Sequence, residues 1–63
     1  MYYEITMKIP QGDLMFKREV ENSFQIFDEI DKIINNISKN FNITKEEIEV
    51  WKVIRVAAPY STL

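Results

Sequence analysis

Residues 23–41, SFQIFDEIDKIINNISKNF, form the segment that is long and periodic enough to organise a hydrophobic core. Apolar residues recur in it every three or four positions, which is the spacing of one face of an α-helix. The residues of this apolar stripe are Phe24, Phe27, Ile30, Ile34, Ile37 and Phe41, widened by Ile26 and Ile33. Because the intervening positions are polar, the segment predicts one amphipathic helix with one buried face.

The chain before this helix predicts a β-hairpin. Residues 2–9 alternate between apolar and polar side chains, as in a half-buried strand. Residues 10–13, PQGD, are typical of a tight turn, and residues 14–20 resume the alternation, although Arg18 interrupts it and favours a strand end or a bulge there. Asn22 or Ser23 can cap the helix that follows.

The chain after the helix predicts a third strand. Residues 44–47, TKEE, have the spacing of a capping box and predict a short helical turn. Residues 48–57 are rich in Val and Ile and largely alternate, interrupted by Lys52, which favours a strand over a second helix starting at Lys45. If the helix crosses back over the hairpin, the third strand pairs antiparallel beside the first.

The predicted fold is therefore α+β, in the order β-β-α-β. We expect a three-stranded antiparallel sheet of order 2-1-3, with one long helix packed on one face. Residues 1–57 form the single domain in this prediction, and residues 58–63 form a C-terminal tail without periodicity.

Self-association is one way in which so small a domain can gain stability. A chain of 63 residues buries about 60% of its unfolded surface on folding, less than a larger domain, and this chain contains no cysteine and no histidine to supply disulfides or the usual zinc ligands. Because 46% of its residues are hydrophobic, the chain can bury further apolar surface against a second copy of itself. We therefore expect a homo-oligomer, most simply a two-fold dimer.

Composition also narrows the classes of function. The chain has no histidine and no cysteine for acid–base or nucleophilic catalysis, and a single glycine leaves no glycine-rich phosphate loop, so we expect no enzyme, no cofactor and no metal. No apolar run reaches the roughly 20 residues of a membrane-spanning helix, and no signal-peptide pattern follows Met1, so the expected location is the cytoplasm.

The predicted open face of the sheet is unusually apolar. Regular alternation through the third strand places Trp51, Val53 and Arg55 on it, beside Tyr2 and Met15 from the hairpin. Three interpretations of Trp51 remain open: a core residue, a dimer interface, or a contact for another protein, since Trp, Tyr and Arg are enriched at binding hot spots. We hypothesise that these five residues form a protein–protein interface, with an unpaired strand edge as a further surface for assembly.

The alternative function is weak nucleic-acid binding. Lys17, Arg18, Lys52 and Arg55 would contact phosphates while Trp51 stacks on a base. The net charge of −2 argues against a strong polyanion-binding surface. Small size and abundant Ile, Asn and Lys are also typical of phage or mobile-element accessory proteins, which often bind or modulate a host protein.

Overall fold

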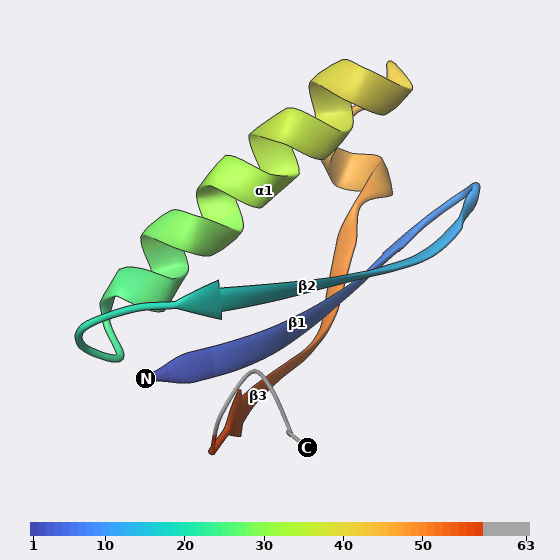
Figure 1. The fold of residues 1–63 in the computed structure, drawn as a ribbon. Coiled ribbons are helices and arrows are strands. Elements are labelled where there is room, and N and C mark those ends of the chain that lie inside the picture. Colours follow the sequence, from blue (N-terminus) through green and yellow to red (C-terminus); the bar gives the residue numbers. More distant parts are fainter. Residues whose placement is uncertain (58–63) are drawn as a thin grey trace.

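The computed structural model describes residues 1–57, which fold into one sheet and one long helix (Figure 1). The elements are β1 (Tyr2–Ile9), β2 (Gly12–Glu19), α1 (Gln25–Phe41), the 3₁₀ turn η1 (Lys45–Glu47) and β3 (Glu49–Val56). The strands pair antiparallel in the order β2-β1-β3, and α1 lies over one face of the sheet. The predicted α+β fold and its strand order are confirmed, and the alternative of a second helix in place of β3 is wrong. The predicted tail lies outside the described residues.

The hairpin is joined by a two-residue turn. Ile9 pairs with Gly12, which leaves Pro10 and Gln11 between the strands. Gly12 has φ +143°, a backbone conformation that residues with a side chain rarely adopt, and this explains why glycine stands there. The strand β2 ends at Glu19, directly after Arg18, so the predicted strand end near Arg18 is confirmed; its pairing with β1 is regular, so the alternative of a bulge there is wrong.

The helix begins and ends as its polar residues predict. The Asn22 side-chain oxygen Oδ1 accepts hydrogen bonds from the backbone N–H groups of Phe24 and Gln25 at 3.1 and 3.3 Å. In return, Gln25 Oε1 accepts from the backbone N–H of Glu21 at 2.7 Å. These bonds satisfy donors that an unprotected helix start would leave unpaired. At the other end, Asn42 has φ 55°, the left-handed conformation that stops the helix.

The core lies between α1 and the central strand β1. Ile5 and Met7 of β1 are fully buried at 0% exposure, and Ile33 of α1 is 2% exposed. The buried apolar residues that form the cluster are Ile5, Met7, Ile9, Ile26, Ile33, Ile37 and Ile48. The central position of β1 explains this distribution, because β1 has a neighbouring strand on each side as well as the helix above it.

The buried stripe of α1 is narrower than the sequence indicates. Phe24 and Phe27 are 79% and 64% exposed, so their predicted place in the core is wrong. Phe24 directly precedes the helix with helical backbone angles, φ −72° and ψ −25°, so it projects about 60° from Phe27, three residues later. Phe27 lies about 100° around the helix from the buried Ile26, at the margin of the face that a three-stranded sheet can cover.

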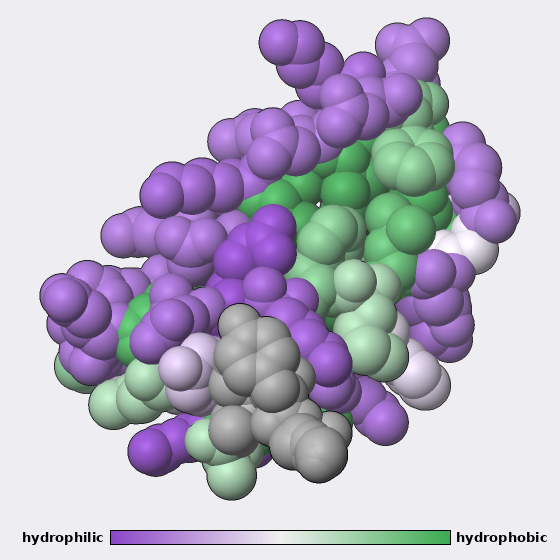
Figure 2. All heavy atoms as spheres, in the orientation of Figure 1, coloured by the Kyte–Doolittle hydropathy of each residue, from purple (hydrophilic) through white to green (hydrophobic). Residues whose placement is uncertain are grey.

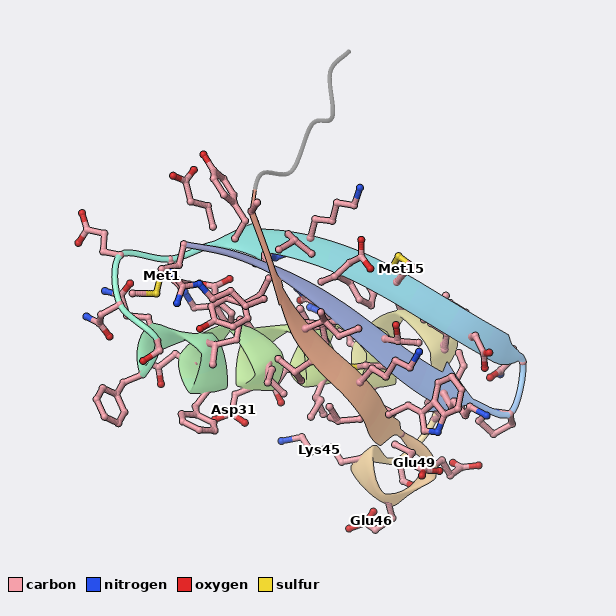
Figure 3. The ribbon with its side chains drawn as sticks, turned by 90° about the horizontal axis from the view of Figure 1, so that it is seen from below. Met1, Met15, Asp31, Lys45, Glu46 and Glu49 are labelled. Carbon is pink, nitrogen blue, oxygen red and sulfur yellow. The ribbon has the colours of Figure 1, made fainter. Side chains whose placement is uncertain are left out.

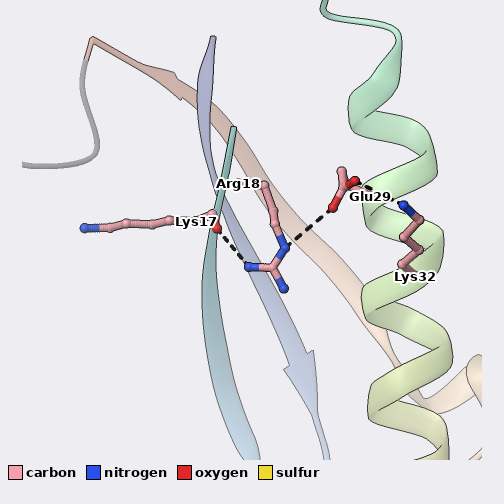
Figure 4. A network of polar contacts seen from close by, with 4 residues as sticks. All are labelled: Lys17, Arg18, Glu29 and Lys32. Atoms are coloured by element: carbon pink, nitrogen blue, oxygen red, sulfur yellow. Dashed lines mark hydrogen bonds and ion pairs between the residues drawn. The ribbon is translucent and has the colours of Figure 1, made fainter. Parts of the chain in front are cut away.

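An ion-pair network ties α1 to β2 (Figure 4). Arg18 Nε lies 3.6 Å from Glu29 Oε1, and Lys32 Nζ lies 3.4 Å from Glu29 Oε2. The Arg18 guanidinium also donates to the backbone carbonyl of Lys17 at 2.8 Å. The partly exposed side chains imply a weak contribution to stability, about 0–1 kcal/mol. The ion pair nevertheless shows that the side of α1 that carries Glu29 faces β2.

Candidate protein–protein interface

The strand β3 is apolar and yet exposed. It pairs with β1 on one side and ends the sheet on the other. Seven of its eight residues are exposed and only Val56 is half-buried, although a core-facing strand would bury every second residue. Val50, Val53, Ile54 and Trp51 are 38%, 40%, 44% and 51% exposed. Large apolar side chains gathered on a sheet margin are typical of a surface that binds another protein.

A β-bulge decides which way the side chains of β3 point. Lys52 lies opposite Thr6 and Val50 lies opposite Met7, so Trp51 is an extra residue in β3. Regular alternation is broken at this position, and the residues after it face the opposite side from that predicted.

This bulge divides the predicted interface between two faces. Val53 lies opposite the buried Ile5, and Arg55 lies opposite Tyr3, which packs against the core. Residues directly opposite each other in an antiparallel pair share a face, so Val53 and Arg55 belong to the helix side of the sheet. Their predicted place on the open face is therefore wrong, and Ile54 takes a place on that face instead, opposite Glu4.

On the outer face, which is the sheet face away from α1, Trp51 lies beneath two lysines. Lys8 Nζ is 4.0 Å from the centroid of the Trp51 ring, and Lys52 Nζ is 5.3 Å from it. A cation above an aromatic face is attracted by about 0.5–1 kcal/mol at an exposed site, which holds the indole against the sheet. The interpretation of Trp51 as a core residue is wrong for the single chain, because half of its surface is exposed. Lys8 was not among the predicted site residues, since its contact with Trp51 depends on the bulge.

Met15 and Tyr2 take their predicted places on the outer face. Met15 is 60% exposed and lies opposite Thr6 of β1. The other neighbour of Thr6 is Lys52 of β3, so the central strand separates Met15 from the bulge. Figure 3 shows Met15 at the β2 margin of the sheet and Glu49 at the start of β3, so the outer face extends between these margins. Tyr2 is half-buried, and it lines a hollow of about 400 Å³ at the end of the sheet together with Arg55.

On the helix side, a second exposed patch adjoins β3. We call it the β3 flank and define it as Phe27, Val50 and Val53. Phe27 projects from the side of α1 opposite Glu29, which faces β2, because two residues are about 200° apart on a helix. Asp31, one turn after Phe27, likewise projects away from β2 in Figure 3. Phe27 thus lies on the side of α1 away from β2, and β3 lies on the side of β1 away from β2.

A groove opens on the other side of the helix, between α1 and β2. Figure 2 shows hydrophobic residues gathered between these two elements and hydrophilic residues around them. The groove measures about 180 Å³. Its lining residues are Leu14, Phe16, Arg18, Ile33, Asn36, Ile37, Asn40 and Phe41. It exposes part of the core without any of the predicted interface residues.

The structure separates the cations predicted to bind nucleic acid. Arg18 lies on the helix side in its ion pair with Glu29, and Arg55 lies on the helix side opposite Tyr3. Lys17 and Lys52 share the outer face, but Glu4 lies opposite Lys17 on the intervening strand. Acidic residues are thus interspersed with these cations, which weakens the field that a polyanion would meet.

The described residues contain few features of other site classes. Within residues 1–57, no group of three or more acidic, histidine or cysteine side chains is arranged to hold a metal ion. None of the helices described is long and apolar enough to cross a membrane. No protein family, curated protein or solved structure compared with this chain matches it.

Proposed function

We propose that this chain is a non-enzymatic protein–protein interaction module that forms a homodimer and binds or modulates another protein. The observation that supports the proposal is the exposure of apolar side chains along both faces of β3. A strand in water is normally protected by polar side chains on its solvent face, whereas β3 carries Trp51 and Ile54 there.

The energy available from covering these side chains is substantial. Phe27, at 64% exposure, still offers about 100–160 Å² of the roughly 150–250 Å² that an aromatic side chain can bury. At about 25 cal/mol per Å², covering Phe27 alone yields about 2.5–4 kcal/mol before the costs of association. Trp51, which is 51% exposed, offers a comparable gain.

Sedimentation velocity over a range of concentrations tests the homodimer. We expect a reversible increase in mass over the micromolar range, because the exposed side chains provide a modest interface. A chain that remains monomeric at about 200 μM contradicts the homodimer, since even weak specific complexes form below millimolar concentrations.

A second candidate is weak binding of single-stranded nucleic acid. The observation that favours it is the position of Lys8 and Lys52 around the exposed Trp51 ring, which combines a stacking surface with cations. Titration of a labelled oligonucleotide at about 50 mM salt tests it, because phosphate contacts are strongest at low salt. Absence of binding under these conditions rejects this candidate.

The composition supports a proposal about the kind of protein that would carry either function. Abundant Ile, Asn and Lys in a short chain support a cytoplasmic accessory protein of a phage or mobile element. Such a protein would act by occupying a surface of a host protein, as an interaction module does.

A further inference from the structure

The two edges of the sheet differ in how they are protected. On β2, the outward side chains of Asp13, Lys17 and Glu19 place charges along the edge. Charged side chains are a common means of preventing unwanted strand pairing. On β3, the bulge, Glu49 and Lys52 lie in the first half of the strand, and the second half carries the single charge of Arg55.

The second half of β3 has the features of a strand that pairs. Residues 53–56, VIRV, are β-branched at three positions, follow the bulge without further irregularity, and contain no proline or glycine. Among the described residues, β3 has β1 as its only neighbouring strand, so its other side presents unpaired backbone donors and acceptors.

We infer that this edge of β3 pairs antiparallel with β3 of a second copy, joining the two sheets into one continuous sheet. The inference rests on the proposed homodimer and assigns its interface. A two-fold axis perpendicular to the sheet keeps both helices on the same side, as an isologous contact requires. Each copy then contributes the same edge to the interface.

The charges of β3 restrict the register of this pairing. In a symmetric antiparallel pair, the residue at the axis lies opposite its own copy. Registers centred on Lys52 or Arg55 place like charges directly opposite each other, which is destabilising. Registers centred on Val53 or Ile54 place β-branched residues opposite each other, which is favourable. The sequence of β3 therefore selects the two central registers.

The β3 flank extends the interface beyond the strand. Because α1 is tied to β2 by the Arg18–Glu29 ion pair, it leaves Phe27 and Val53 uncovered on the β3 side. Pairing of the edges brings the two flanks towards each other across the axis. The Val53-centred register pairs residues 50–56 and the Ile54-centred register pairs residues 52–56, so the paired length is about 16–23 Å. Such a short pairing gives a small interface, at the lower end of the range for specific complexes. We therefore expect a reversible dimer of micromolar affinity.

Ile54→Lys and Met15→Lys form a matched pair of variants that tests the interface. Both replace an exposed apolar residue of the outer face with the same cation, but only Ile54 lies on β3. In the Val53-centred register the new lysine lies opposite Lys52 of the second copy, and in the Ile54-centred register it lies opposite itself. The repulsion, which occurs twice per dimer in the first register and once in the second, should raise the dimer Kd about 10-fold or more in sedimentation, whereas Met15→Lys should change it less than about 2-fold.

Cysteine cross-linking tests the register independently of these charges. The natural chain has no cysteine, so Val53→Cys and Ile54→Cys each introduce a single thiol at a position that is 40% or 44% exposed. At the axis of an antiparallel pair, the two Cα atoms are about 4.5–5.5 Å apart, within the range of a disulfide. We expect one of these variants to form a disulfide-linked dimer under mild oxidation, and Met15→Cys not to form one.

The possible outcomes separate the inference from the proposed function. A dimer that is weakened by Ile54→Lys alone and cross-linked through residue 53 or 54 supports both. A natural chain that dimerises, with Ile54→Lys folded and dimerising equally well, overturns pairing through β3 but leaves the homodimer intact. A disulfide-linked dimer that forms through Met15→Cys and through neither Val53→Cys nor Ile54→Cys also overturns pairing through β3. If circular dichroism shows that Ile54→Lys does not fold, the cross-linking results alone test the pairing. A natural chain that is monomeric throughout overturns both.

Discussion

Two alanine substitutions in α1 measure how much of the apolar stripe is core. Ile33 is 2% exposed and Phe27 is 64% exposed, although both belong to the same apolar stripe of the helix. For Ile33→Ala, we expect a loss of about 2–5 kcal/mol, because the change removes buried methyl groups and leaves a cavity. A domain of this size has a total stability of about 3–9 kcal/mol, so the variant should be close to unfolding.

Phe27→Ala should have a much smaller effect on the single chain. About a third of the side chain is buried, and alanine is the better helix former, so the net loss should be below about 1 kcal/mol. Urea unfolding followed by circular dichroism provides the measurement, at protein concentrations well below those of self-association. With an m value of about 1 kcal/mol per M, Ile33→Ala should lower the midpoint by about 2–5 M or prevent folding, and Phe27→Ala by less than about 1 M.

Equal losses for the two variants would refute this reasoning. They would mean that Phe27 is packed in the core, and the β3 flank would then lose its largest member. If Phe27 lies in the dimer interface instead, Phe27→Ala should weaken self-association in sedimentation while leaving the stability of the dilute chain nearly unchanged.

Two further predictions concern local structure. Gly12→Ala should lower the free energy of unfolding by about 1–3 kcal/mol, because φ +143° strains any side-chain-bearing residue; no atom lies within 4 Å of the added Cβ, so an unchanged unfolding midpoint would contradict strain as the reason for this glycine. Glu29→Gln should cost at most about 1 kcal/mol, since it breaks a partly exposed ion pair with Arg18, and the difference from the natural chain should shrink as salt rises from about 50 mM to 1 M; a salt-independent loss would contradict an electrostatic origin.

The order of the elements could be predicted because each local pattern is self-consistent. Residues 3–9 alternate between apolar and polar side chains, the glycine that the backbone requires directly follows the turn, and Asn22 and Gln25 have capping spacing. Once these elements are fixed, an antiparallel third strand has a natural place beside β1. The sheet order therefore follows from topology.

The faces of β3 could not be predicted in the same way. A single extra residue reverses every side chain that follows it, and the position of a bulge depends on the partner strand. Lys52 interrupts the apolar alternation and is the one sequence signal near the bulge, whereas the interruption at Arg18 is an ion pair rather than a backbone irregularity. The exposure of Phe27 was missed for another reason: periodicity gives the direction of a side chain, while the width of the sheet decides whether that direction is covered.

The position of β1 has a consequence for folding kinetics. Of the three strands, β1 comes first in the sequence, and its two neighbours follow at very different separations, since β2 comes after a two-residue turn and β3 only after the whole helix. The hairpin can form in about 1–10 μs, but pairing of β1 with β3 must close a loop that contains most of the chain. Such non-local pairing slows folding. Until it is complete, the second edge of β1 is open to strands of other molecules, so rapid dilution should favour productive refolding over aggregation.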